Sequence, residues 1–225
     1  MKKQKTDHEN YVSALGYHWL TPFYDSFMRF AGRGNLLMQA LVAQARFEKG
    51  QQVLDLGCGT GALAIMIKHD FPSVDIVALD CDRKMLSIAE HKANQIGADI
   101  QFDLAFAEKL PYPDDSFNRV VSSLLFHHLS WEHKKQVANE IFRVLKPGGE
   151  LHVMDWGRAS NRLMRCLFFA VQLIDGFSNT RDNVSGRLIE VFNEAEFSQV
   201  NQQQSLNTVF GTLALYAAVK AADAG

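Results

Sequence analysis

The sequence of 225 residues is poor in cysteine, and its cysteines do not form a recognisable set. Cys58, Cys81 and Cys166 are widely spaced and include no CxxC pair, so neither a zinc site nor a disulfide framework is expected. Unpaired cysteines are typical of a reducing compartment, and we therefore expect a cytoplasmic protein. The eight histidines also lack the spacing of metal ligands, so no metal is expected.

Long apolar runs and an excess of charge of either sign are also missing. The longest apolar stretch, Leu163 to Ile174, is interrupted by Arg165 and is too short to span a bilayer. The basic start of the chain is not followed by an apolar segment of signal-peptide length, which argues against secretion. A formal net charge of −2 gives no electrostatic reason to expect nucleic acid as a partner.

These absences leave a small molecule as the expected partner. We expect no transmembrane segment. Four arginines either bind a membrane surface or an acidic substrate group, or are simply solvated: Arg158, Arg162, Arg165 and Arg181. The sequence does not indicate an oligomeric state.

The chain does contain a regular alternation of short apolar runs and helical segments, which predicts one α/β domain with a parallel sheet. Near the end, Gln199–Leu206 and Phe210–Val219 are separated by only a few residues and are expected to pair as an antiparallel hairpin. Other strands are expected at 53–56, 74–79, 100–105, 120–125 and 151–154, helices at 36–47, 61–69, between Asp82 and Gly97, 132–145, 161–174 and 185–197, and a turn at Pro147-Gly148-Gly149.

A glycine-rich turn after the first apolar run is the most informative part of the sequence. Asp55 leads into this turn, which contains Gly57, Gly59 and Gly61. Glycine permits positive φ and close approach of a ligand, and a helix that begins in such a turn offers unpaired backbone amides. Asp55 would repel a dinucleotide pyrophosphate by about a kcal/mol or more, but would attract a cationic amino acid end. S-adenosylmethionine has this charge pattern and no phosphate.

A nucleotide cofactor is the alternative ligand. The pattern Gly57-x-Gly59-x-x-Ala62 also satisfies the looser dinucleotide fingerprint. Asp80, which ends the second apolar run, is equally suited to the ribose of NAD, so an NAD-linked oxidoreductase is a second hypothesis.

Four motifs extend the pattern: Asp55-Leu-Gly-Cys-Gly-Thr-Gly61, Val77-Ala-Leu-Asp80, Ala107-Glu-Lys-Leu-Pro-Tyr-Pro-Asp114 and Arg143-Val-Leu-Lys-Pro-Gly-Gly149. With these motifs the chain, from about Tyr11 to Lys220, resembles the class I S-adenosylmethionine-dependent methyltransferases, in particular the branch of ubiquinone and menaquinone C-methyltransferases. The resemblance implies a doubly wound, Rossmann-like domain over residues 35–225, after an N-terminal tail and helical cap over residues 1–34. It implies a mostly parallel sheet of seven strands in the order 3-2-1-4-5-7-6, with strand 7 antiparallel and helices on both faces.

The resemblance also implies the function and the cofactor site. The expected reaction moves the methyl group of S-adenosylmethionine to a carbon, oxygen or nitrogen of a small, apolar or aromatic acceptor by in-line displacement, leaving S-adenosylhomocysteine. Asp80 is expected to bind both ribose hydroxyls, and the backbone of Ala107 to contact adenine. Phe106 stands where the family often has Asp or Asn, so either adenine is recognised by backbone and stacking or the correspondence shifts locally. The cofactor residues implied are Asp55, Gly57, Cys58, Gly59, Thr60, Gly61, Asp80, Cys81, Met85, Phe106, Ala107, Glu108 and Ser123.

The acceptor side is less defined. His127 and His128 follow the fourth expected strand, and a histidine there is a candidate general base because its pKa lies near neutrality. Packing or a hydrogen bond to a neighbouring loop is the alternative. A cofactor-binding module without transferase activity is a further hypothesis, since no residue is decisively catalytic. A substrate pocket is expected between five aromatic side chains, unless they merely complete the core: Tyr17, Trp19, Phe23, Tyr24 and Phe168.

Overall fold

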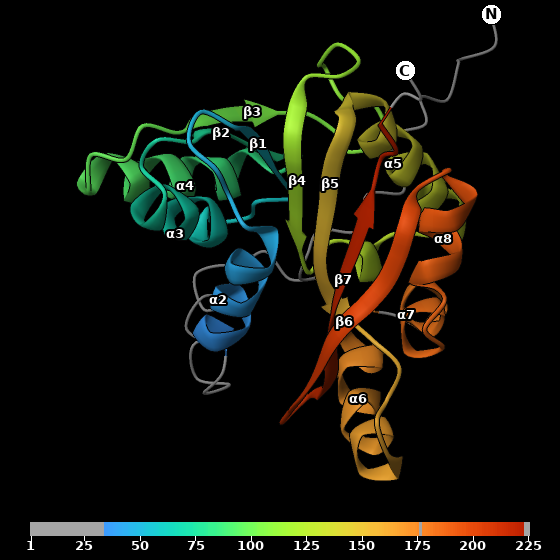
Figure 1. Ribbon diagram of the computed structural model, residues 1–225. Helices are drawn as coiled ribbons and strands as arrows, with labels where there is room; N and C mark the ends of the chain where they lie inside the picture. Colours follow the sequence, from blue (N-terminus) through green and yellow to red (C-terminus); the bar gives the residue numbers. More distant parts are fainter. Residues whose placement is uncertain (1–33, 176, 223–225) are drawn as a thin grey trace, which may run out of the picture.

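Parallel pairing of short apolar strands builds the centre of the molecule. The computed structural model describes residues 34–175 and 177–222, and its seven-stranded sheet has the order β3-β2-β1-β4-β5-β7-β6 (Figure 1). β7 runs antiparallel to β5 and to β6, so the predicted order and orientation are confirmed. The strands are β1 (Gln52–Leu56), β2 (Asp75–Asp80), β3 (Gln101–Leu104), β4 (Phe117–Ser123), β5 (Leu145–Trp156), β6 (Ser198–Thr208) and β7 (Gly211–Val219).

Helices cover both faces of the sheet because its strands are apolar on both sides. The buried side chains of α2 and α3, with Leu86 of α4, join one apolar cluster that also contains Val53 and Val121. Those of α5 and α8 join a second cluster with Leu54 and Val120. None of the helices in the described ranges combines the length and apolar character needed to cross a bilayer. The helices are α2 (Gly34–Ala45), α3 (Ala62–Asp70), α4 (Arg83–Gln95), the 3-10 turn η3 (Phe126–His128), α5 (Trp131–Val144), α6 (Arg162–Asp175), α7 (Phe177–Val184) and α8 (Leu188–Glu194).

Two local predictions are wrong. Pro147-Gly148-Gly149 is not a turn outside the sheet but part of β5, because Gly148 donates to the Lys220 carbonyl oxygen and Gly149 accepts from the Lys220 amide, both over 2.9 Å. The helix expected at 185–197 is shorter, α8 (Leu188–Glu194), and it follows a helix that was not expected, α7 (Phe177–Val184). Gly186 has a φ of 77° and separates them, because that conformation cannot continue a right-handed helix.

The closing hairpin leaves β6 at an edge of the sheet. β6 and β7 pair antiparallel across the short connection between Thr208 and Gly211, which confirms the predicted hairpin. All five residues from Asn201 to Ser205 are exposed and polar. β7 lies inside the sheet, and its residues from Gly211 to Tyr216 are buried.

The carboxyl ends of the parallel strands place acidic and hydroxyl side chains at one edge. Asp55 and Asp80 stand at the ends of β1 and β2, Ser123 ends β4, and Asp155 is the penultimate residue of β5. Ligands of doubly wound sheets bind at this edge, so the functional site is expected here.

Candidate functional site

The turn between β1 and α3 requires glycine at two positions. Gly57 and Gly61 have φ angles of 72° and 77°, in the left-handed region that other residues rarely adopt. A Cβ on Gly61 would lie 2.8 Å from the Cβ of Ala89 on α4, and one on Gly57 would lie 3.0 Å from the side chain of Leu125. The turn is therefore packed on one side by α4 and on the other by the segment that follows β4.

Asp55 is a buried carboxyl with one oxygen in use. Its Oδ2 accepts a hydrogen bond from the Ala64 amide over 3.1 Å, whereas Oδ1 is buried and has no partner. Burial raises the pKa of Asp55 to about 7, and the negative charge of Asp80 acts in the same direction. A buried carboxylate oxygen without a donor is suited to a cationic N–H group, which would both pair with it and favour its ionised form.

Asp80 is fixed by backbone donors from two segments. Its Oδ2 accepts from the Gly59 amide and its Oδ1 from the Asp82 amide, each over 2.8 Å. Burial nevertheless raises the pKa of Asp80. Each carboxylate oxygen can accept two hydrogen bonds, so both oxygens retain capacity for two further donors such as vicinal hydroxyls. Asp82 itself accepts from the Lys84 amide over 2.8 Å and caps α4.

The segment after β3 is held in place by Arg143 on α5. The Arg143 guanidinium donates to the carbonyl oxygens of Leu110 and Tyr112 over 3.1 and 2.8 Å. Glu140 accepts from the Leu110 amide over 2.7 Å and from the Arg143 guanidinium. Earlier in the same non-helical segment, Ala107 is buried and Phe106 is 45% exposed.

A left-handed residue turns the chain at the end of β4. Leu124 has a φ of 60°, and its amide still donates to the Met154 carbonyl oxygen over 2.8 Å. The next residue, Leu125, covers Gly57. Strained backbone of this kind is typical of functional sites, and here it directs η3 towards the end of β5.

Near the end of β5, Asp155 binds His127. The Asp155 carboxylate is fully buried and lies 2.9 Å from His127 Nδ1. It also accepts hydrogen bonds from the amides of His127 (3.3 Å) and Trp156 (2.6 Å) and from Asn183 Nδ2 on α7 (3.0 Å). Since a carboxylate only accepts, His127 Nδ1 carries the proton, and Nε2 is the acceptor nitrogen of the neutral ring.

His128 differs from its neighbour. Its ring stacks on that of His127, with centroids 3.9 Å apart. Burial and the adjacent His127 hold the pKa of His128 well below its usual value of 6.5. The two histidines are therefore not equivalent, and only His127 lies against a carboxylate in the interactions described above.

Further buried polar groups surround Asn183. Lys134 on α5 is fully buried with its Nζ 3.7 Å from Asp182 Oδ2. Burial lowers the pKa of Lys134, while Asp182 and Asp155 oppose that shift. Asn183 Oδ1 and Tyr216 Oη are buried without partners. The end of β5 thus borders a polar region inside the second apolar cluster.

Asp155 was not predicted. It follows the apolar run Leu151–Met154 as Asp80 follows its own, so the same signal was present in the sequence. The sequence Asp182-Asn-Val-Ser-Gly-Arg187 indicates that Asn183 and Arg187 either reach the pocket or begin a helix, and the structure places Asn183 Nδ2 against Asp155.

The other predicted residues are placed as follows. Met85 and Cys58 are buried beside the turn, and burial raises the pKa of the Cys58 thiol, which stays protonated at neutral pH. Glu108 lies 3.5 Å from His133 Nδ1. Phe168 is 1% exposed and packs edge-on against Trp156 with ring centroids 5.1 Å apart, so its side chain is in the core. Four residues of the predicted substrate pocket lie outside the described residues: Tyr17, Trp19, Phe23 and Tyr24.

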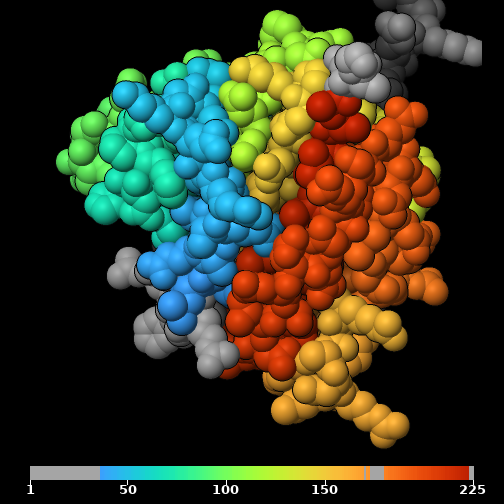
Figure 2. Space-filling view, in the orientation of Figure 1, coloured from blue at the N-terminus to red at the C-terminus, as the bar shows by residue number. Residues whose placement is uncertain are grey.

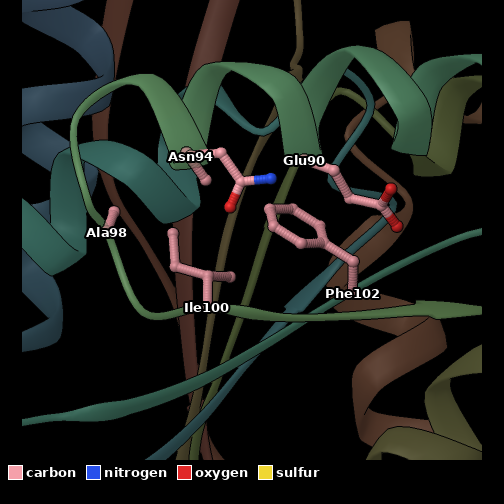
Figure 3. Close-up of a pocket in the computed structure, with 6 residues that line it drawn as sticks. Glu90, Asn94, Ala98, Ile100 and Phe102 are labelled. Carbon is pink, nitrogen blue, oxygen red and sulfur yellow. The ribbon is translucent and has the colours of Figure 1, made fainter.

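One hollow lies apart from these residues. It has a volume of about 240 Å³ and lies between α4 and the chain that enters β3 (Figure 3). None of the predicted site residues lines it; the lining residues are Glu90, Ala93, Asn94, Ala98, Ile100 and Phe102. Within residues 34–175 and 177–222, no group of acidic, histidine and cysteine side chains is arranged to hold a metal ion.

Comparison with known proteins agrees with this geometry. Residues 53–149 match the family model described as a methyltransferase domain. The chain is 34% identical over 139 residues to a demethylmenaquinone methyltransferase of Thermus thermophilus, a match that covers 61% of this chain and 62% of that protein. It is 27% identical to a demethylmenaquinone methyltransferase of Symbiobacterium thermophilum, with 94% and 93% of the two chains covered. The first curated relatives are thus matched over about three fifths of their length.

Solved structures show the same fold. A protein of Methanosarcina mazei described as an S-adenosylmethionine-dependent methyltransferase superposes with a TM-score of 0.66 at 18% sequence identity. The match covers 81% of this chain and 98% of that one. At this identity the likeness establishes the architecture alone.

Proposed function

The chain belongs to the class I S-adenosylmethionine-dependent methyltransferases, and we propose that it transfers the cofactor's methyl group to a small, apolar or aromatic acceptor by in-line displacement. The observation that carries the proposal is the buried carboxyl of Asp55 together with the half-buried carboxyl of Asp80, which binds the Gly59 amide of the glycine turn. Their remaining acceptor capacity matches an ammonium at one end of a ligand and a diol at the other.

The residues present fit this cofactor. Oδ1 of Asp55 lacks a donor that the ammonium of an amino acid would supply. Asp80 is held by the amides of Gly59 and Asp82, so its oxygens are oriented before a ribose binds. A side chain at Gly57 would collide with Leu125, and one at Gly61 with Ala89. Both positions therefore remain glycine, and the cofactor can approach the backbone of the turn closely. Phe106, Ala107 and Ser123 complete the proposed adenosine side.

His127 is proposed as the group that accepts the acceptor's proton. When bound, S-adenosylmethionine supplies a methyl group made electrophilic by its sulfonium and is released as S-adenosylhomocysteine. An acceptor O–H, N–H or acidic C–H must lose a proton as the new bond to methyl forms. Nε2 of His127 takes that proton, and Asp155 stabilises the resulting imidazolium through Nδ1. Alignment of the two reactants supplies roughly 7–11 kcal/mol besides this.

The acceptor is proposed from the relatives. Both curated relatives described above are demethylmenaquinone methyltransferases, which makes a quinone-type ring the first acceptor class to test. We propose that Phe168 faces this acceptor only indirectly, with Trp156 between Phe168 and His127, because Trp156 contacts both rings.

Calorimetric titration with S-adenosylmethionine and S-adenosylhomocysteine tests the cofactor, and mass-spectrometric detection of a methylated naphthoquinol tests the transfer. We expect both ligands to bind at sub-millimolar concentration. Failure of both to bind to a folded sample contradicts the proposal. Saturable binding of NAD(H) instead would favour the oxidoreductase reading, and binding with no transfer to any acceptor would favour a cofactor-binding module.

A further inference from the structure

Helix α6 differs from the rest of the surface in both charge and apolarity. From Trp156 to Ile174 the chain contains three arginines and no acidic residue, although the whole chain has a formal net charge of −2. All three arginines are exposed: Arg158 in the connection after β5, and Arg162 and Arg165 on α6. This segment therefore has a positive charge, whereas the net charge of the whole chain is negative.

The helix has two distinct faces. Met164, Phe168 and Gln172 are buried at a spacing of four residues and attach the helix to the domain. The opposite face exposes Leu163 and Phe169, which are 63% and 50% accessible. Arg162 and Arg165 flank these two residues on the exposed side of the helix, and Cys166 is exposed on the same side. Large apolar and cationic side chains that share an exposed helix face are typical of a helix that lies on a membrane surface.

The arginines on this face are not neutralised within the described part of the chain. The ion pairs formed there do not include Arg158, Arg162 or Arg165. Arg165 donates to the amide oxygen of Gln172 over 2.7 Å, a neutral partner that leaves the positive charge uncompensated. An anionic surface is the complement that these charges lack.

The position of α6 matters as much as its composition. α6 follows β5 directly and lies beyond the carboxyl end of the sheet, at the lower end of Figure 1. In the space-filling view it projects from the molecule (Figure 2). Val209, in the turn between β6 and β7, is a further exposed apolar residue. The turn lies close to α6, since a Cβ on Gly211 would be 3.0 Å from the Phe168 side chain.

We propose that α6 and the β6–β7 turn form a docking surface for an anionic lipid bilayer. Arg158, Arg162 and Arg165 would bind the lipid headgroups, while Leu163, Phe169 and Val209 enter the boundary between headgroups and acyl chains. Docking in this orientation would turn the carboxyl edge of the sheet towards the bilayer. This inference concerns the surface alone and does not depend on the proposed reaction.

Vesicle sedimentation of the full chain tests the charge. We expect binding to vesicles of phosphatidylglycerol and phosphatidylcholine, little binding to pure phosphatidylcholine, and a loss of binding as salt increases. Each arginine near an anionic bilayer contributes about a fivefold change in partitioning, so R158Q/R162Q/R165Q should weaken binding by roughly a hundredfold. The matched control K49Q/R83Q/K84Q removes three exposed cations elsewhere and should leave it nearly unchanged.

The apolar contribution is tested separately. L163S and F169S should each reduce binding, whereas I96S removes a comparable exposed apolar side chain outside the surface and should not. An environment-sensitive fluorophore on Cys166 should shift to the blue with anionic vesicles, with C166S as the labelling blank. Absence of vesicle binding at low salt, or equal loss in the α6 variants and their controls, overturns the proposal.

Discussion

The backbone amide of Gly59 donates to Asp80 Oδ2 over 2.8 Å, so the turn after β1 and the carboxylate that ends β2 are one hydrogen-bonded unit. Neighbouring parallel strands bring the two segments together, since Asp55 pairs in register with Ala78 of β2. The proposed contacts to the two ends of the cofactor are therefore preorganised by the sheet itself.

Replacing Asp80 by Asn should weaken S-adenosylmethionine binding by about 10- to 100-fold, because a hydrogen bond to a charged group contributes about 1.5–3 kcal/mol. Calorimetry gives the affinity. Asp75→Asn at the exposed start of β2 is the control, and equal affinities for the two variants would refute a ribose contact at Asp80. Urea denaturation of both proteins separates lost binding from lost folding.

Asp55 should make stability depend on pH. Its pKa is raised from 3.8 to about 7 in the folded chain, so the folded state holds a proton that the unfolded state has released. Stability from this group is therefore highest below about pH 4 and declines as pH rises to about 7, at about 1.4 kcal/mol per pKa unit. Asp55→Asn should remove this slope, which urea titrations at pH 5 and pH 8 measure.

The same group should make cofactor affinity depend on pH. Ionised Asp55 attracts a cationic ligand, so binding of S-adenosylmethionine should strengthen as pH rises towards 7 and release a proton below that value. Titration in two buffers of different ionisation enthalpy counts the proton. Identical heats in both buffers near pH 6 would exclude the linkage.

Gly61→Ala should destabilise the fold by about 2–4 kcal/mol, from a left-handed backbone and a Cβ only 2.8 Å from that of Ala89. Gly97→Ala is the matched control, since Gly97 also has positive φ (66°) but open space around it, and should lose only about 1–2 kcal/mol. Adding Ala89→Gly to Gly61→Ala should recover part of the loss if the collision is the cause. Chemical denaturation curves measure all four proteins.

Asp155→Asn and His127→Gln should each lower kcat with little change in KM, by about 10²–10⁴ for loss of a general base. His128→Gln is the control, because the low pKa of His128 makes it a weak base. A kcat that falls equally in all three variants would assign His127 a structural role only.

The sequence correctly predicted those features whose physical cause lies within a short segment of the chain. Glycines with positive φ and carboxylates that end apolar strands are both local, and the structure places each as expected. The sheet order came from the family resemblance rather than from such signals.

Features that depend on distant partners were missed. Gly148 and Gly149 looked like a turn because the strand that bonds them, at Lys220, is about 70 residues away in the chain. The hydrogen bond between Asn183 and Asp155 joins α7 to β5 over 28 positions in the chain. The choice between His127 and His128 likewise required a contact with β5.

β6 closes the sheet with an unpaired edge, and its outer residues from Asn201 to Ser205 are amides and a hydroxyl. An intruding strand would gain backbone hydrogen bonds there but no apolar contact, and it would desolvate side chains that water already satisfies. The composition of β6 therefore protects this border of the sheet against aggregation.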